Sequence, residues 1–258
     1  MTRILVSCFA LAVAGVAGAA QPSIDVGDSW TYEARDGYSF DKDPFAVLQV
    51  EVTGISDGEV VTQVTNTTNG EVGTERFTRR WDPVDADWAV AQPFPFALGY
   101  HDFLVHPLTR VGSKIREASY DTSARALVMQ HFQFSTPYPE FPDRLEPGTS
   151  WRGETSARNA TTGHQVKVGV TGKVLGDARI HVPAGDFDTV KLERITYFFD
   201  EGFRHTNTRV TDTEWFAPRL GRSVKYETKW DYYDKNSSYP VIHPGDWAVY
   251  ELTSYSKK

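Results

Sequence analysis

The sequence predicts an all-β protein in which a curved antiparallel sheet forms a β-roll, half-barrel or open barrel. Short runs of alternating apolar and polar residues recur along the chain, and Gly, Pro and Asp-Gly turns separate them. Aromatic residues make up 13% of the chain, a composition that suits pleated sheets. The connections between neighbouring runs are shorter than the crossover that parallel strands require, so the strands should be antiparallel.

The pattern is clearest over residues 173–230. Pro183 has no N–H to donate to a sheet ladder and Gly185 can turn with positive φ, so a first strand containing Val174 should end there. The stretch predicts a meander of four strands: one ending at Pro183, two over residues 187–199 and 204–215, and one beginning at Val224.

Strands also dominate the N-terminal part of the chain. Asp57-Gly58 and Asn69-Gly70 are strong hairpin signals, because a tight hairpin turn needs residues that accept positive φ. The alternating runs around them predict strands over residues 29–33, 46–55, 58–66 and 74–81.

Residues 82–146 differ from the rest. Prolines interrupt this region repeatedly, and proline cannot continue a central ladder. Its aromatic side chains are nevertheless too numerous to leave in water, so we expect a packed, aromatic and Pro-rich connecting region. Further strands are expected there over residues 104–113 and 124–134.

The same region supplies the predicted ligand-binding residues. Ligand sites are usually concave and apolar, and aromatic side chains at the mouth of a curved sheet would line such a site. The alternative is that these side chains only cover the open end of the core. The candidates are Phe94, Phe96, Tyr100, Phe103, Phe132, Phe134 and Tyr138, with Phe141 beside them.

Three segments of the mature chain resemble one another. Each places a Gly turn and a small polar residue before a Trp: Trp30, Trp151 and Trp247. A tight turn of this kind delivers an aromatic anchor into the core where a strand starts. We therefore expect one all-β domain over residues 21–258, and the repeated segments suggest two related β units, 21–145 and 146–258, with a closing C-terminal strand. A chance recurrence of a common turn is the alternative.

The first 20 residues have the pattern of a secretory signal peptide. Arg3 precedes an apolar run over residues 4–18, and small residues precede a cleavage site near residue 20. The run is too short to cross a bilayer, so no transmembrane segment is expected and the mature protein should be periplasmic or secreted. Cys8, the one cysteine, follows a lipobox-like Leu5-Val6-Ser7, but the apolar run continues past it, which favours an ordinary signal peptide over lipidation.

Several function classes find no support in the composition or the motifs. The net charge of −7 gives no reason to bind nucleic acid. Gly27-Asp28-Ser29 resembles the GDS block of GDSL-type esterases, but no Asp lies three residues before His205 or His243 to complete a triad. The spacing of His101 and His106 matches no common zinc site. No phosphate loop or dinucleotide fingerprint is present. We predict no metal, no cofactor and no identifiable catalytic residue.

Two motifs resemble those of the TapB-like family of exported bacterial proteins of unknown function. They are the V-P-A-G-x-F turn at residues 182–187 and the W-F-A-P-x-x-G segment at residues 215–221, within a match over residues 147–230. The chain departs from the family pattern at Arg222-Ser223, where one residue is usual. The resemblance implies an envelope location and a β-roll distantly similar to periplasmic lipoprotein carriers, and it brings no catalytic residues.

These observations favour an exported, non-enzymatic protein that binds a lipid or another hydrophobic or amphiphilic envelope component. A cell-envelope or polysaccharide hydrolase is the alternative, with a carboxylate pair drawn from neighbouring strands. A third reading is a structural partner of an envelope protein. The carboxylates available to the hydrolase are Asp186, Asp188, Glu193, Asp212 and Glu214.

Overall fold

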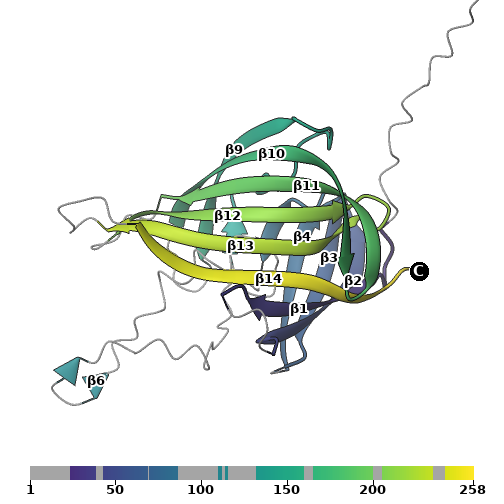
Figure 1. Ribbon diagram of the computed structural model, residues 1–258, viewed down its shortest axis with the longest axis horizontal. Helices are drawn as coiled ribbons and strands as arrows, with labels where there is room; N and C mark the ends of the chain where they lie inside the picture. Colours follow the sequence, from purple (N-terminus) through teal and green to yellow (C-terminus); the bar gives the residue numbers. More distant parts are fainter. Residues whose placement is uncertain are drawn as a thin grey trace, which may run out of the picture.

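The computed structural model describes residues 24–38, 43–68, 70–86, 110–111, 114–115, 132–159, 165–199, 205–234 and 242–258. Figure 1 shows the molecule as a curved, closed sheet. The predicted signal peptide lies outside these residues. Within them, no helix is long and apolar enough to cross a membrane.

Twelve strands form a closed antiparallel barrel, in the order β1-β14-β13-β12-β11-β10-β9-β8-β5-β4-β3-β2. Two short strands, β6 (Arg110–Val111) and β7 (Lys114–Ile115), pair separately with each other. The barrel strands are β1 (Ser29–Asp36), β2 (Ala46–Ser56), β3 (Glu59–Asn66), β4 (Glu71–Thr78), β5 (Pro83–Ala86), β8 (Phe132–Phe134), β9 (Ser150–Asn159), β10 (Gln165–Val182), β11 (Gly185–Phe198), β12 (His205–Ala217), β13 (Arg222–Asp234) and β14 (Ile242–Ser256).

The predicted all-β antiparallel fold is confirmed, and the barrel is closed. β14 pairs with β1 along the whole length of β1, so the first and last strands share a ladder. The hairpin at Asp57-Gly58 is present, with φ of 48° and 83° at the two residues. Some strand boundaries differ from those expected. The strand expected over residues 29–33 extends to Asp36, and the one expected over residues 74–81 is β4, which runs from Glu71 to Thr78, so that Trp81 lies in the following turn with φ of 67°.

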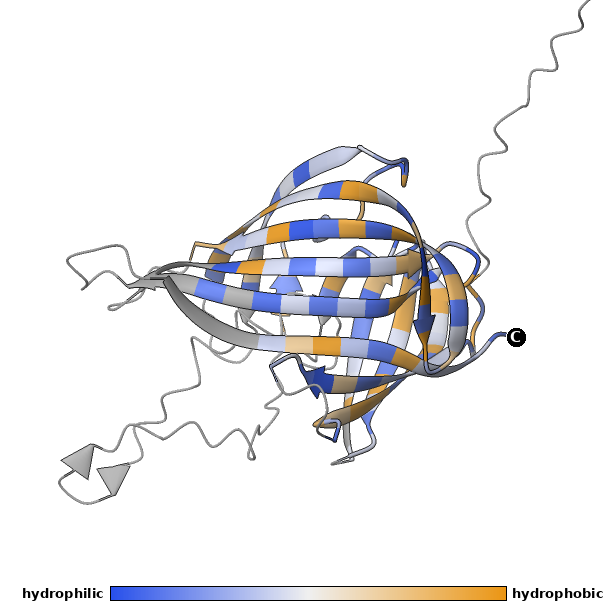
Figure 2. Cartoon of the chain, in the orientation of Figure 1, coloured by the Kyte–Doolittle hydropathy of each residue, from blue (hydrophilic) through white to orange (hydrophobic). Residues whose placement is uncertain are grey.

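Alternation along the strands sorts the side chains between the lumen and the outer surface. β11 alternates buried and more exposed residues over most of its length, as β10 does. Figure 2 shows the corresponding alternation of apolar and polar residues along β10 to β14. The buried apolar residues of all the long strands form one core inside the barrel.

The connections between antiparallel strands alternate between the two ends of the barrel. At one end, which we call the turn end, all five connections lie within the described residues. At the other, the loop end, every connection includes residues outside them. The chain leaves β5 at Ala86 and returns to β8 at Phe132, its cross-strand neighbour, so residues 87–131 join the barrel at the loop end.

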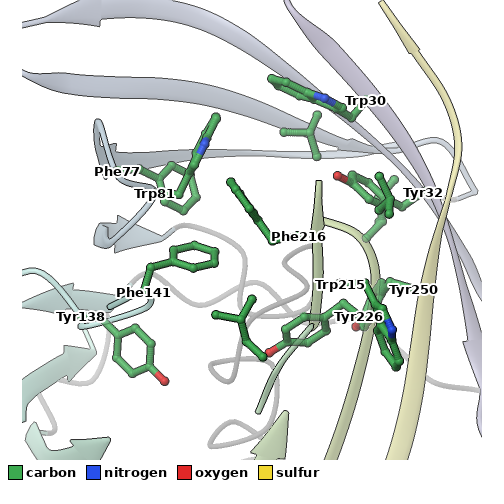
Figure 3. Packing of buried hydrophobic residues seen from close by; sticks show 14 of the residues in the cluster. Trp30, Tyr32, Phe77, Trp81, Tyr138, Phe141, Trp215, Phe216, Tyr226 and Tyr250 are labelled. Atoms are coloured by element: carbon green, nitrogen blue, oxygen red, sulfur yellow. The ribbon is translucent and has the colours of Figure 1, made fainter. Parts of the chain in front are cut away.

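Aromatic side chains close the turn end. Trp81 contacts Trp30 and Phe77 edge to face, with ring centroids 5.9 and 5.5 Å apart. The Arg222 guanidinium lies 4.2 Å from the Trp81 ring and 5.4 Å from the Trp30 ring. Figure 3 shows the three aromatic side chains around the upper part of the core. The barrel is therefore filled by side chains at this end.

The first two of the predicted turn-and-Trp segments make the same backbone hydrogen bonds. Gly27 donates to the carbonyl of Val52, and Gly148 donates to the carbonyl of Val174, each over 2.8 Å. Each Val N–H donates back to the residue after that glycine. Both valines are followed by a bulge in the next strand pairing. The two turns thus start β1–β2 and β9–β10 in the same way.

A second correspondence lies at the next turns along the chain. Thr74-Glu75-Arg76-Phe77 in β4 and Thr213-Glu214-Trp215-Phe216 in β12 both reach a bulge at the Phe. Each then enters a turn with a positive-φ residue, Trp81 or Gly221. We propose that β1–β5 and β9–β13 are related units, with β8 and β14 joining them into the barrel.

Asp28 ties the two ends of the described chain together. Its buried carboxylate accepts hydrogen bonds from the Asp25 N–H (3.0 Å), the Lys257 Nζ (2.5 Å) and the Lys258 N–H (3.0 Å). Burial alone would raise the pKa of Asp28, but these bonds outweigh it and lower the pKa. These hydrogen bonds therefore stabilise the protein at pH values above the pKa that Asp28 has in the unfolded chain. The stabilisation is lost as the pH falls through the lower pKa that Asp28 has in the folded protein.

We expect Asp28→Asn to lower the free energy of unfolding by about 2 kcal/mol at pH 7, because charge-assisted hydrogen bonds are lost. Below the folded pKa of Asp28 the two proteins should be equally stable. Urea unfolding of the mature chain and the variant between pH 7 and pH 2 measures both values. If the variant were less stable by the same amount at every pH, the charge of the Asp28 carboxylate would not be the source of the stabilisation.

Candidate functional site

A segment of chain occupies the inside of the barrel. Residues 135–145, which we call the inner strap, form the first part of the connection from β8 to β9. The side chains of Tyr138 and Glu140 are completely buried, and Phe141 packs on Phe216 with ring centroids 5.2 Å apart. Figure 3 shows Tyr138 and Phe141 extending from this segment toward the core residues of the opposite wall. The strap thus fills space that the wall side chains leave open.

The wall of the barrel is shaped to receive the strap. A Cβ at Gly153 in β9 would lie 2.6 Å from Pro139, closer than real Cβ atoms approach other atoms. The Trp151 indole N–H donates to the Pro139 carbonyl over 3.0 Å. The Tyr138 hydroxyl lies 2.6 Å from the hydroxyl of Thr196 in β11. Glycine and short polar side chains therefore form the bed of the strap.

The strap is also bonded to the start of β5 and to the turn between β4 and β5. The Tyr138 N–H donates to the Pro83 carbonyl (2.8 Å), and the Asp82 carboxylate accepts from the N–H groups of Glu140 and Phe141 (3.0 and 3.3 Å). β5 and β8 are joined by only two residue pairs. The strap thus bridges the barrel where its ladder is shortest.

Four charged side chains meet beside the strap, and we call them the Arg194 cluster: Arg194, Glu140, Asp212 and Glu214. The Arg194 Nη2 lies 2.5 Å from a carboxylate oxygen of Glu140. Its Nη1 lies 3.3 Å from Glu214, and its Nε lies 3.4 Å from Asp212. All four side chains are at most 2% exposed.

The three carboxylates differ in their hydroxyl partners. Asp212 accepts a hydrogen bond from Thr228 over 2.7 Å, and Glu214 accepts a short one from Ser223. Glu140 has only its ion pair with Arg194: neither of its side-chain oxygens has a hydrogen-bond partner among the described residues. Hydrogen bonds from hydroxyl groups thus stabilise the ionised forms of Asp212 and Glu214, whereas Glu140 receives no such bond.

Burial raises the pKa of all three carboxyl groups, although Arg194 offsets part of the effect. For Glu140 the charges of Glu214 and Asp212 add to burial, and its pKa lies well above the usual range. Three ionised carboxylates against one guanidinium would leave the buried cluster with a net charge of −2. The cluster therefore takes up a proton more readily than carboxylates in water.

The predicted aromatic site residues fall into two groups. Phe94, Phe96, Tyr100 and Phe103 lie outside the described residues. Phe132 and Tyr138 are buried and Phe134 is half-buried, with the rings of Phe134 and Tyr138 6.2 Å apart. Phe134 and Tyr138 thus pack on each other, and Phe132 belongs to the same core. Ligand contact by any of the seven stays a prediction.

The Arg194 cluster was not recognised from the sequence. Asp212 and Glu214 were named there only as members of a possible hydrolase pair. Arg194 follows Leu192 at the next inward position of β11, and a charge on the apolar face of a strand is the signal that could have found it. No such signal exists for Glu140, because its partner lies 54 residues away in the sequence.

The carboxylates of the hydrolase alternative do not come together in a cleft. Asp212 and Glu214 are buried in the cluster, whereas Asp186, Asp188 and Glu193 lie exposed on the outer surface. Asp186 pairs with His181 over 2.8 Å in solvent. Within the described part of the chain, no group of three or more His, Cys, Asp and Glu side chains is placed to hold a metal ion.

A shallow groove of about 380 Å³ lies on the outside of the barrel, over β9, β10 and β11. Gly169 forms its floor, and Phe199 covers part of that glycine. Arg152, Glu154 and Tyr197 also line it. Lys167 pairs with Glu154 over 2.8 Å at this surface. The groove is open to solvent and separate from the Arg194 cluster.

Three solved structures resemble the chain over most of its length. They are a candidate exported protein with a YmcC-like fold from Bacteroides fragilis (TM-score 0.49, 13% identity, 92% of this chain and 98% of that chain), a candidate lipoprotein from Parabacteroides distasonis (0.45, 13%, 90% and 96%), and the hypothetical lipoprotein YmcC of Escherichia coli (0.43, 7%, 90% and 86%). At these values none of them transfers a residue role or an activity.

No protein-family model and no curated protein matches the chain. The resemblance to the TapB-like family therefore stays a prediction.

Proposed function

We propose that the protein is an exported, non-enzymatic carrier or sensor that binds a hydrophobic or amphiphilic envelope component inside the barrel. The observation that carries this proposal is the inner strap. Side chains alone fill a barrel of about eight strands, and wider barrels hold a ligand, a plug or a channel. Here a twelve-stranded barrel holds residues 138–142 of its own chain, the largely buried part of the strap.

The surroundings of the strap suit an amphiphile. The lumen offers apolar walls from Val168, Val170 and Val210, and it offers the charged Arg194 cluster beside them. An acyl chain has a thickness similar to that of an extended polypeptide, so it fits the path that the strap vacates. A polar head group would then find hydrogen-bonding partners at the cluster.

Export is proposed from the signal-peptide pattern of the first 20 residues, with a mature chain that begins near residue 21. No observation favours the hydrolase alternative, because the cluster carboxylates are closed off from solvent and held by Arg194. An envelope protein as the partner is an outcome that the binding experiment distinguishes.

The test uses a disulfide that locks the strap. The Cβ position of Gly153 lies 2.9 Å from the Cβ of Pro139, and a disulfide needs about 3.8 Å, so a shift of about 1 Å forms the bond. The mature chain has no other cysteine, since Cys8 precedes residue 21. Palmitic acid and lysophosphatidylethanolamine serve as probes, with binding measured by native mass spectrometry and calorimetry.

We expect the reduced Pro139→Cys/Gly153→Cys protein to bind a probe at least about tenfold more tightly than its oxidised form, because the lock removes the binding-competent state. Oxidised and reduced samples of one protein are the matched control. Equal affinity in both forms would place the ligand outside the lumen. Absence of binding to either probe by the unmodified mature chain, with no lipid co-purifying, would reject the proposal and direct attention to a protein partner.

A further inference from the structure

One titratable group holds the middle of the strap inside the barrel. The strap has two acidic residues: Asp143 is exposed and pairs with Arg80, whereas Glu140 lies in the lumen. Glu140 is attached to Arg194 twice, since its backbone carbonyl accepts from the Arg194 Nη1 over 3.0 Å. The ionisation of this one side chain therefore bears directly on the position of the strap.

The charged and titratable groups around Glu140 come from every side. Arg194 on β11 is the cation, and Asp212 and Glu214 on β12 are the neighbouring acids. The turn between β4 and β5 contributes Asp82, whose charge also acts on Glu140. The hydroxyls of Tyr138 on the strap and Tyr226 on β13 complete the surroundings.

Glu140 is the carboxyl group best placed to carry the shared proton. Asp212 and Glu214 each receive a hydroxyl hydrogen bond that stabilises their ionised form, and Glu140 does not. With a neutral Glu140, the cluster has two carboxylates and one guanidinium, a charge of −1. Loss of the proton from Glu140 makes the charge −2 among side chains that are at most 2% exposed, and burial of unpaired charge is costly.

Release of the strap leaves the long strand ladders of the barrel intact. β8, from which the strap starts, has three residues and two pairs with β5. Release breaks the strap's own hydrogen bonds, including those of the Tyr138, Glu140 and Phe141 amides, whereas β10, β11 and β12 keep their long ladders without it. Opening at this place is thus less costly than unfolding.

We propose that the inner strap is a lid operated by pH: it stays in the lumen while Glu140 is protonated and is released as Glu140 ionises. The proposal deepens the proposed function, because the released state is the one that would admit an amphiphile. Once released into water, Glu140 has the ordinary pKa of about 4.3. Between the pKa of Glu140 in the released strap and its raised pKa in the closed strap, the closed state binds one proton more than the released state. The closed state therefore becomes less favourable as the pH rises through this range.

Hydrogen exchange of the mature chain without any lipid tests the lid. The amides of Tyr138, Glu140 and Phe141 donate in the closed strap, so their protection reports closure. Between pH 5 and pH 9, after correction for intrinsic exchange, we expect this protection to fall by up to about tenfold per pH unit over part of the range, as one proton requires. Amides of the β10–β11 ladder should not follow.

Glu140→Gln keeps the shape of the neutral acid and cannot ionise. We expect its strap amides to stay protected across the same pH range. The proposal is wrong if strap protection in the unmodified chain is independent of pH, if it falls only together with the β10–β11 ladder, or if Glu140→Gln shows the same fall. Because no lipid is present, this result stands or fails independently of lipid binding.

Discussion

Replacing Arg194 with Met should lower the free energy of unfolding at pH 7 by about 3–5 kcal/mol, the cost of breaking a buried ion pair by removing one partner. Arg194 is 1% exposed and is the cation of the cluster. Without it, Asp212 and Glu214 face each other and Glu140 with no guanidinium, and their pKa values must rise further. Urea unfolding followed by far-ultraviolet circular dichroism measures the change.

Arg209→Met is the matched control. Arg209 lies on β12 and pairs with Asp231 over 2.6 Å, at the outer surface, with 34% of its side chain exposed. Such a pair contributes less than about 1 kcal/mol, because solvent screens it. A comparable loss for both variants would mean that Arg194 acts only as one more salt bridge.

A rescue experiment separates charge from packing. If the loss comes from uncompensated carboxylates, adding Asp212→Asn and Glu214→Gln to Arg194→Met should recover part of it, since the neutral amides do not repel one another. If the loss comes from the missing side-chain volume, the added substitutions should make the protein less stable still. The two explanations therefore predict changes of opposite sign in the free energy of unfolding when the two substitutions are added.

Local sequence signals were sufficient for most of the strands. At Asp57-Gly58 the residue types fit the positive φ of the turn, and the strands on either side pair from the first residue. Pro183 and Gly185 likewise mark the turn between β10 and β11, where Val182 pairs with Gly185. In both places the conformation depends on the residues themselves, so it can be predicted from them.

The interior could not be predicted in the same way. The position of the strap depends on contacts such as Tyr138 with Thr196 and Glu140 with Arg194, 58 and 54 residues apart. The prolines of residues 137–142 correctly indicated that this segment leaves the sheet, but the same composition suits a loop outside the barrel. Whether it lies inside depends on the width of the barrel, and that follows from the number of strands that close it.

The missed strand boundary at Trp81 has a physical cause. An apolar residue at the end of an alternating run reads as strand, yet Trp81 adopts positive φ, which costs a non-Gly residue roughly 1 kcal/mol. Gly221 is the positive-φ residue of the turn between β12 and β13, and its carbonyl accepts the Trp81 indole N–H over 2.7 Å. The turn between β4 and β5 thus tolerates an unfavourable backbone conformation that places a ring at the turn end of the barrel.

Substitutions at Trp81 should therefore reverse the usual order of alanine and glycine. Trp81→Ala should lower the free energy of unfolding by about 3–5 kcal/mol, because a buried ring and its contacts with Trp30 and Phe77 are lost. Trp81→Gly loses the same ring but relieves the positive-φ strain, so it should cost about 1 kcal/mol less. Thermal and urea unfolding of both variants measures the difference.

Phe77 provides the comparison, since it is equally buried in the same cluster and does not have positive φ. At Phe77 the glycine variant should have a free energy of unfolding about 1 kcal/mol lower than the alanine variant, because glycine adds backbone freedom to the unfolded chain. The same order at both positions, with alanine better than glycine, would show that the backbone at Trp81 is not strained. Opposite orders would show that the turn end is closed by a tryptophan at a position whose backbone favours glycine.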